Sequence, residues 1–350
     1  MSKDKGPINI SNDEIEAARK AHNVTPIKPV QYVSPMGMTQ IQNEIPPIKQ
    51  YALHPIIPVQ GIIFVYAASG VGKTMFSLNL AYAIASGGNF LKYSAPKPRK
   101  VLYIDGEMAY VDIHSRLMQI VNQQGNLDFP ENFMIYTPDK LIPEGHTQPI
   151  RMPKICQAEG QMFYEMAIER HDIDVIVVDN LSMLATIDFD KAHEVYILND
   201  WFLSLRAKGK TLIVVHHSGK DPETYRGSSR MLDPIDTAIS LQTIEESLPD
   251  QSDDESALGK RFKIVYKKNR SFFGKDAFPY EVTFLNEKWS HRNIELSVMD
   301  KIISCISAGM NQRDIAKELL ISQSTLHRMI QKGRKQGLIR GESKPTQEKV

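Results

Sequence analysis

The stretch that decides the fold runs from residue 62 to residue 74 and reads Ile-Ile-Phe-Val-Tyr-Ala-Ala-Ser-Gly-Val-Gly-Lys-Thr. Its first six residues are apolar, which predicts a buried strand over Ile62–Ala67. A turn with two glycines follows, and then the apolar spacing of a helix over 75–86. A strand, a glycine turn and a helix in this order, with Lys73 and Thr74 at the start of the helix, are typical of a phosphate-binding loop. Ala67 replaces the usual first glycine.

This loop has the groups that a nucleoside triphosphate needs. Gly70 and Gly72 let backbone N–H groups turn toward phosphate oxygens, and the start of the helix adds its own unpaired N–H groups. The Lys73 ammonium would hold the β- and γ-phosphates, and the Thr74 hydroxyl would bind Mg²⁺. We therefore expect ATP and Mg²⁺ as cofactors, with ATP held by Ala68, Ser69, Gly70, Val71, Gly72, Lys73, Thr74 and Met75.

Strands and helices alternate along the chain after the loop. Short apolar runs predict buried strands at 100–104, 175–178 and 211–215, and helical spacing predicts helices over 112–123 and 193–207. Weaker strand patterns lie at 133–136, 237–241, 262–266 and 281–284. Apolar strands that alternate with helices predict an α/β fold whose mostly parallel sheet is covered on both faces.

Two acidic residues follow predicted strands, at the sheet edge where ligands bind in such folds. Asp179 suits the carboxylate that holds Mg²⁺ in a P-loop ATPase, and a turn-capping role is the alternative. Glu107 lies one short turn beyond its strand, where a carboxylate can orient and activate the attacking water. Asp105 competes for that role, and both acids could instead cap the helix near Asp112.

Together these motifs resemble the RecA-like ATPase core of hexameric replicative helicases. The resemblance is closest to the plasmid-encoded RepA-type helicases, with the DnaB helicase more distant. It covers about residues 51–285 and rests on the phosphate loop and the strand ends at Glu107 and Asp179. Two further segments contribute: 212–220, which reads LIVVHHSGK, and 226–229, which reads RGSS.

The resemblance implies a role for each strand end. Glu107 would be the catalytic base and Asp179 the magnesium carboxylate. The histidine at the strand end, His216, would sense the γ-phosphate and couple it to DNA-binding loops. From the residues alone, His216 and His217 end a buried strand where a neutral imidazole can donate to a phosphate oxygen. A structural histidine in the core is the alternative for each.

Cationic residues farther along suggest contacts with polyanions. Arg226 and Ser228 lie in a polar loop suited to gripping a nucleotide or single-stranded DNA; the alternative for Arg226 is an ordinary solvated side chain. The resemblance also implies a cationic finger that reaches the γ-phosphate of a neighbouring subunit. Lys268 and Arg270 match the DnaB-like spacing, Lys263 is the alternative in the RepA-like group, and a basic hairpin that touches DNA or only solvent is another.

The C-terminal region changes to an all-helical pattern after residue 289. Apolar residues at three- and four-residue spacing predict helices over 294–308, 312–320 and 323–336. The third helix exposes polar residues near its start and cations farther along: Gln323, Ser324, Thr325, His327, Arg328 and Lys332. This is the layout of a helix-turn-helix recognition helix that reads duplex DNA, with a small wing from 337–340 as an option. A protein-interaction bundle is the alternative.

Composition sets the outer limits. The 350 residues carry a net charge of +1 with 42% hydrophobic residues, which excludes a disordered or collagen-like chain. The two cysteines are far apart, which argues against a disulfide framework or a cysteine-based zinc site. No apolar stretch is long enough to span a bilayer, and the N-terminus lacks an apolar signal core. A cytoplasmic protein without a membrane partner is therefore expected.

Charge is unevenly distributed. Six acidic residues lie in 245–255, seven basic residues and no acid in 256–275, and ten basic against four acidic residues in 301–350. The acidic run is expected to be an exposed loop. The two basic segments indicate contacts with nucleic acid, or else two solvated faces.

These patterns predict four segments. Residues 1–50 form an extended arm with a short helix over 13–21, because the stretch 26–58 has seven prolines. Residues 51–290 form the RecA-like P-loop ATPase domain, 291–340 the helix-turn-helix domain and 341–350 a flexible tail.

The expected function is an ATP-dependent DNA helicase of plasmid or mobile-element replication. It would assemble into a ring, a hexamer by the resemblance, and translocate on single-stranded DNA. A DNA-binding regulator switched by ATP is the alternative, and a recombinase-like filament is a third.

Overall fold

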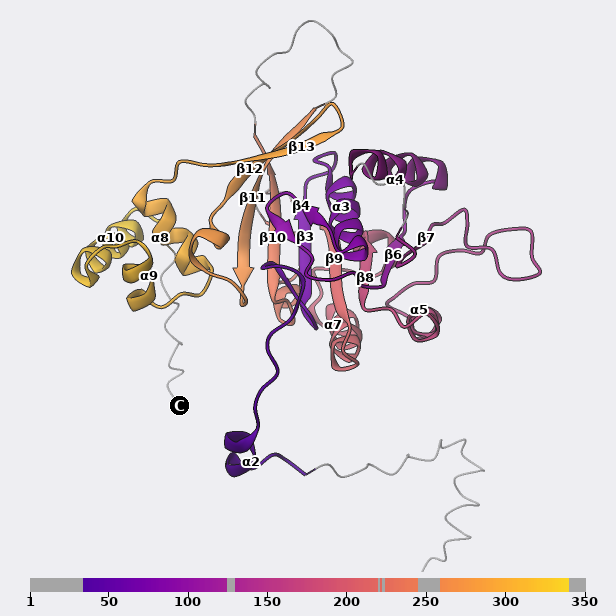
Figure 1. The fold of residues 1–350 in the computed structure, drawn as a ribbon, viewed down its shortest axis with the longest axis horizontal. Coiled ribbons are helices and arrows are strands. Elements are labelled where there is room, and N and C mark those ends of the chain that lie inside the picture. The colour runs from indigo at the N-terminus through magenta and orange to yellow at the C-terminus, as the bar shows by residue number, and fades with distance from the viewer. Residues whose placement is uncertain (1–33, 125–129, 220, 222–223, 245–258, 340–350) are drawn as a thin grey trace, which may run out of the picture. The chain divides into compact units, whose positions relative to one another are not determined.

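The computed structural model describes residues 34–339 apart from 125–129, 220, 222–223 and 245–258 (Figure 1). The chain divides into two units, Met1–Ile48 and Lys49–Val350. In the described part of the first unit, α2 (Met38–Asn43) is a short helix with no buried residue. The helix expected over 13–21, the acidic run 245–255 and the tail 341–350 all lie outside the described residues.

The second unit is built on a nine-stranded sheet in the order β13-β12-β11-β10-β3-β9-β8-β6-β7. The parallel strands are β10 (Thr237–Thr243), β3 (Ile62–Ala67), β9 (Thr211–His217), β8 (Val175–Asp179), β6 (Val101–Asp105) and β7 (Phe133–Tyr136). The antiparallel strands are β11 (Lys260–Asn269), β12 (Tyr280–Leu285) and β13 (Lys288–Asn293). The predicted α/β fold with a mostly parallel sheet is confirmed.

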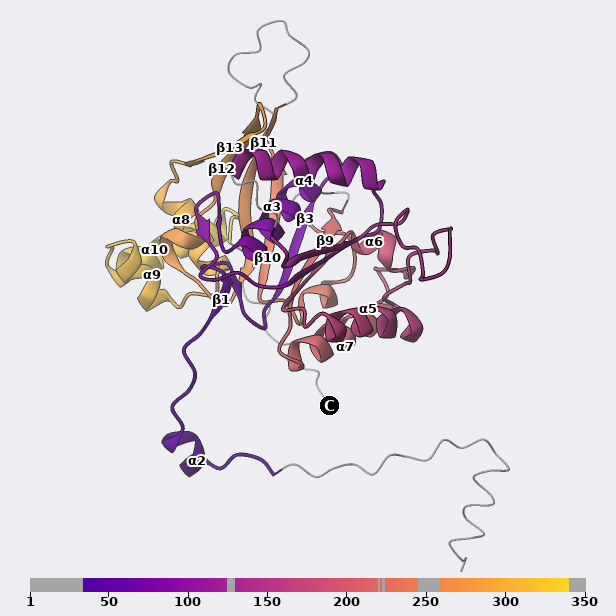
Figure 2. The same ribbon diagram turned by 45° about the vertical axis from the view of Figure 1, so that its right-hand side comes forward.

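Helices cover both faces of this sheet (Figure 2). The helices on one face are α3 (Lys73–Ser86) and α4 (Tyr110–Gln124); those on the other are α5 (Ala158–Arg170), α6 (Leu181–Leu184) and α7 (Ala192–Ala207). Side chains of β3 alternate between the two layers, with Ile63 and Val65 toward α3 and Ile62 and Phe64 toward α7. A strand buried on both sides has no polar face, which is why its sequence is continuously apolar.

The last part of the proline-rich stretch 26–58 belongs to the core, which begins close to the domain boundary expected at residue 51. β1 (Tyr51–Leu53) and β2 (Ile57–Pro58) pair as antiparallel strands, and Leu53 and Ile57 are fully buried in the core. The prolines keep both strands short, yet the apolar residues between them pack with α3 in one cluster. A second short hairpin, β4 (Asn89–Phe90) and β5 (Tyr93–Ser94), follows α3.

Three C-terminal helices are present: α8 (Val298–Ser307), α9 (Gln312–Glu318) and α10 (Gln323–Lys335). Each begins with a side-chain cap, and Ser297 and Asp300 form a full capping box on α8. Their core is joined by Phe278, which precedes β12, and the Ser304 hydroxyl donates to the Ala277 carbonyl at 3.3 Å. The 3₁₀ helices η1 (Ser229–Leu232) and η2 (Gly274–Ala277) lie between the last strands.

The boundary expected at residue 291 falls inside a strand. Strands were expected to stop after residue 289, whereas β13 continues to Asn293 and pairs with β12 along its whole length. β13 is an edge strand whose residues are mostly exposed, so its sequence lacks an apolar alternation that would have indicated it.

Candidate functional site

A pocket of about 490 Å³ lies at the carboxyl edge of the parallel strands. Residues 69–75 of the phosphate loop line it, with Glu107 after β6, Asp179 at the end of β8 and His217 at the end of β9. Strand–helix units converge on one edge because every parallel strand points the same way. Residues that were far apart in the sequence are therefore brought together as expected.

The phosphate loop has a backbone that requires glycine. Gly70 and Gly72 have φ of 80° and 112°, and an added Cβ would meet no atom within 4 Å at either position. Conformation, and not space, therefore excludes other residues here. Lys73 Nζ donates to the carbonyls of Ala67 at 3.0 Å and Ala68 at 2.9 Å. Burial lowers the pKa of Lys73, while Asp179 and Glu107 raise it.

Asp179 is almost fully buried and surrounded by hydroxyl groups. Its Oδ2 accepts hydrogen bonds from Tyr103 at 2.5 Å and Ser77 at 3.3 Å, and Thr74 also donates to it. Burial raises the pKa of Asp179, and these hydroxyls and Lys73 oppose the rise. A hydroxyl and a carboxylate in contact at the pocket fit the oxygen donors that Mg²⁺ takes from a protein beside substrate phosphates.

Glu107 and Asp105 have different surroundings. Glu107 lines the pocket, and its Oε2 accepts a hydrogen bond from Asn180 Nδ2 at 2.5 Å. Asp105 is buried and accepts the backbone N–H groups of Glu107 at 2.7 Å and Met108 at 2.8 Å. Burial raises the pKa of Asp105 to about 6. Asp105 thus holds the turn that presents Glu107, and neither acid caps α4.

The two histidines face opposite sides of β9. His217 lines the pocket, and burial followed by Lys73 lowers its pKa. His216 is fully buried, and its Nε2 donates to the Arg226 carbonyl at 3.2 Å while Nδ1 accepts from the Ser182 hydroxyl at 3.3 Å. Burial lowers the pKa of His216 to about 3. The phosphate-facing position expected for His216 therefore belongs to His217, because adjacent strand residues point to opposite faces.

Arg226 and Ser228 lie away from the phosphate loop. Arg226 lines a second pocket of about 480 Å³ together with Lys191, Asp188 and Phe189. Its backbone N–H donates to the His217 carbonyl at 3.2 Å. Ser228 caps η1 through its side chain. This hydrogen bond links the Arg226 backbone to His217, the residue of β9 that lines the first pocket.

Lys268 and Arg270 lie at the opposite edge of the sheet from the phosphate loop. Their strand is antiparallel to β10, and Asn269 pairs with Thr237 at the start of β10. Lys268 donates to the Leu232 carbonyl, and Arg270 lies 3.7 Å from Asp236. Neither residue reaches the pocket of its own chain. Lys263, the alternative finger, is absent from the lining of that pocket.

The residues expected to contact duplex DNA lie on α10. Gln323, Ser324, Arg328 and Lys332 are exposed, and Thr325 is half-buried. The hydroxyls of Ser324 and Thr325 bond to Ser322, which caps the helix. Arg328 and Lys332, farther along the helix, are therefore the exposed side chains of this face that are most available to a ligand.

Sequence reasoning missed several residues of the site. Asn180 directly follows the expected Asp179, and its position after a strand end is the only signal that could have indicated it. Lys260, Phe262, Phe284 and Trp289 line the pocket from β11, β12 and β13, and Arg116 and Gln119 line it from α4. Nothing in the sequence indicated that these antiparallel strands would reach the phosphate loop.

Two comparisons with known proteins give matches. Residues 30–223, more than half of the chain, match the AAA domain family, AAA_25. A KaiC-like protein from the hyperthermophilic archaeon Pyrococcus horikoshii OT3 has a similar structure, with a TM-score of 0.43 and 10% identity over 67% of this chain and 90% of that one. No curated protein matches the chain. Within the described residues, no helix has the length and apolar character to cross a membrane.

Proposed function

The chain belongs to the AAA domain family and has a RecA-like P-loop ATPase core, and from this premise we propose that it is a ring-forming, ATP-dependent DNA helicase of plasmid or mobile-element replication. In this proposal it hydrolyses ATP with Mg²⁺ and translocates on single-stranded DNA. The observation that carries the proposal is the backbone contact between His217 at the pocket and Arg226 in the next loop.

The proposed chemical step is the attack of water on the γ-phosphorus. Glu107 accepts the proton of the water as the bond to the γ-phosphorus forms and the bond to the ADP oxygen breaks. Asn180 supports this role by holding the Glu107 carboxylate, at 2.5 Å. Lys73 balances charge on the phosphates. Mg²⁺, held by Thr74 and Asp179, supplies further neutralisation of the phosphate oxygens when it is bound.

The contacts of β9 support coupling between ATP and DNA. The carbonyl of His217 and the imidazole of His216 both bond the backbone of Arg226. A displacement of His217 on loss of the γ-phosphate would therefore move the Arg226 loop. With Ser228 in the same loop, this segment is proposed to hold single-stranded DNA. Lys268 and Arg270 are proposed to act on the nucleotide of a neighbouring subunit.

Two measurements test the helicase proposal. On a forked duplex with a fluorescent strand, ATP and Mg²⁺ should release the strand, and Arg226→Ala should abolish release while ATP binding persists. The particle mass with a slowly hydrolysed ATP analogue should correspond to six chains. ATP hydrolysis without strand release on any fork, and a dimeric particle, would contradict the proposal.

A second function, an ATP-switched DNA-binding regulator, is favoured by one observation. The exposed cations Arg328 and Lys332 on α10 give the C-terminal helices a surface for duplex DNA that a single-strand motor does not require. A regulator would bind one duplex sequence in an ATP-dependent way and displace no strand. Deleting residues 296–350, beyond β13, should remove duplex binding and leave basal hydrolysis within about twofold.

A further inference from the structure

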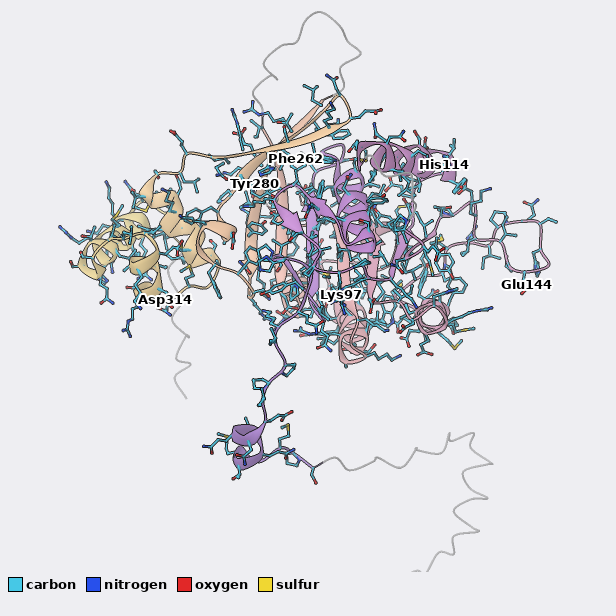
Figure 3. The ribbon with its side chains drawn as sticks, in the orientation of Figure 1. Lys97, His114, Glu144, Phe262, Tyr280 and Asp314 are labelled. Atoms are coloured by element: carbon cyan, nitrogen blue, oxygen red, sulfur yellow. The ribbon has the colours of Figure 1, made fainter. Side chains whose placement is uncertain are left out.

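The pocket extends beyond the phosphate loop onto the antiparallel strands. Phe262 of β11, Phe284 of β12 and Trp289 of β13 line it, and Figure 3 labels Phe262 on its strand. α4 contributes Arg116 and Gln119 to the same pocket. One end of the pocket is thus polar and rich in backbone N–H groups, and the other is aromatic. The two ends match the two chemical halves of a nucleotide.

The Trp289 ring is held firmly in place by other rings. Its centroid lies 4.7 Å from that of Phe284, 5.2 Å from that of Phe90 and 6.2 Å from that of Phe262. Phe90 and Phe262 are buried, so this support belongs to the core. Trp289 itself is half-buried and lines the pocket. A fixed indole surface at the edge of a pocket is a ready platform for a flat ring.

Helix α4 adds polar side chains to this part of the pocket. Gln119 lines it, and its amide can donate to and accept from the edge of a base. Arg116 lines the same pocket, and its planar guanidinium can also stack on a base.

We infer that the aromatic end of the pocket is a nucleobase site in which Trp289 stacks on a purine. This inference rests on the proposed nucleotide binding and extends it to the base. Stacking depends on ring area more than on the pattern of donors and acceptors. The site therefore separates purine from pyrimidine triphosphates more strongly than it separates ATP from GTP.

The chain offers a direct optical test, because Trp201 and Trp289 are its two tryptophans. Trp201 is buried and donates to Glu165 at 2.9 Å, away from the pocket lining. In the Trp201→Phe protein all tryptophan fluorescence comes from Trp289. A slowly hydrolysed ATP analogue with Mg²⁺ should change that emission at saturation. Inorganic tripolyphosphate, which has no base, should compete for the loop without changing the emission.

Substitution gives the energetic test in the full chain. Trp289→Ala should weaken binding of the ATP analogue by about 5- to 100-fold and leave tripolyphosphate binding within twofold. Trp289→Phe should keep ATP binding within about threefold. In the wild type, GTP should compete within about fivefold of ATP, and CTP and UTP more weakly.

Each failure has a distinct meaning. Equal emission changes with tripolyphosphate and the ATP analogue, or unchanged ATP affinity in Trp289→Ala, would overturn the base site. If Trp289→Ala lost affinity for the ATP analogue and for tripolyphosphate by the same factor, that result would also overturn the base site. If neither ligand bound the wild type, the proposed ATPase function would fall along with it. The emission test uses native Trp289, so it holds even if Trp289→Ala does not fold.

Discussion

The parallel and the antiparallel halves of the sheet differ in what they bring to the pocket. The parallel half supplies Lys73 at the start of α3, Glu107 just beyond β6 and Asp179 at the end of β8. The antiparallel half supplies Phe262, Trp289 and the attachment of α8 through β11 and η2. We infer that chemistry on phosphate is concentrated in the first half. The second half recognises the rest of the ligand and joins the C-terminal helices to the core.

The largest effect is expected in the parallel half. Lys73→Ala should reduce kcat/KM for ATP by about 1,000-fold or more, because it removes the buried cation that faces the phosphates. Steady-state phosphate release measures this loss. The matched control is Lys97→Ala, an exposed lysine outside the pocket lining, for which kcat/KM should stay within about threefold of the wild type. A Lys73→Ala protein with near-normal turnover would contradict the role of the loop.

Glu107→Gln separates binding from turnover at the same edge. It should lower kcat by about 100- to 10,000-fold with little change in the affinity for ATP, because the amide cannot accept the proton of water. Single-turnover hydrolysis and analogue binding measure the two quantities. Asp105→Asn keeps an acceptor for the backbone N–H groups of Glu107 and Met108. It should therefore lower kcat by less than tenfold. Wild-type kcat in Glu107→Gln would refute the assignment of the base.

The two histidines test the two faces of β9. His217→Ala should abolish the stimulation of ATP hydrolysis by single-stranded DNA and change the free energy of unfolding by less than about 0.5 kcal/mol. His216→Ala should lower the free energy of unfolding by about 1–3 kcal/mol, because it removes buried hydrogen bonds to Arg226 and Ser182. Urea unfolding and DNA-dependent hydrolysis distinguish them. A large loss of stability in His217→Ala, with a loss of DNA stimulation only in His216→Ala, would contradict the placement of His217 at the pocket and His216 in the core.

The pKa of His216 predicts a smaller effect that depends on pH. Its pKa is about 3 in the folded protein and about 6.5 when unfolded, so the unfolded chain binds more protons between these values. Burial of the neutral His216 imidazole therefore contributes to the free energy of unfolding. That contribution is complete above pH 6.5 and is lost as the pH falls toward 3. At pH 5 the loss is about 2 kcal/mol.

The matched variant is His216→Gln. It should show a smaller drop in the free energy of urea unfolding between pH 7.5 and pH 5 than the wild type. Asp105 acts in the opposite direction, since its raised pKa lowers stability as the pH rises from 4 to 6. The wild type and the variant share that contribution, so it cancels in the comparison. Equal drops in both proteins would show that His216 is not neutral in the fold.

The sequence indicated the strands of the parallel half and also β11 and β12 of the antiparallel half, but it missed β13. Strands such as β3 and β8 are buried on both faces, and burial alone makes them continuous apolar runs. β13 is an exposed edge strand, so no pattern marks it. α5 was missed although Tyr164, Ala167 and Ile168 have helical spacing. Its Gly160 reads as a turn, whereas a Cβ there would lie 2.0 Å from the Lys154 carbonyl.

The site was predictable where a residue's role depends on its position along a strand. Lys73, Thr74, Glu107 and Asp179 follow from strand ends and the loop. Partners that come from pairing of distant strands, such as Trp289, depend on sheet order, which local spacing does not encode. The choice between His216 and His217 needed the register of the strand face, which a run of apolar residues buried on both sides does not reveal.

Hydrogen exchange of the full chain tests the central claim most directly, namely that a triphosphate binds at the carboxyl edge of the parallel strands. Exchange is followed by mass spectrometry with and without a slowly hydrolysed ATP analogue and Mg²⁺. We expect the strongest protection in peptides that cover residues 69–75, with further protection at 105–108 and 179–180. Protection that is absent from residues 69–75, or that is confined to the second pocket near Arg226, would contradict it.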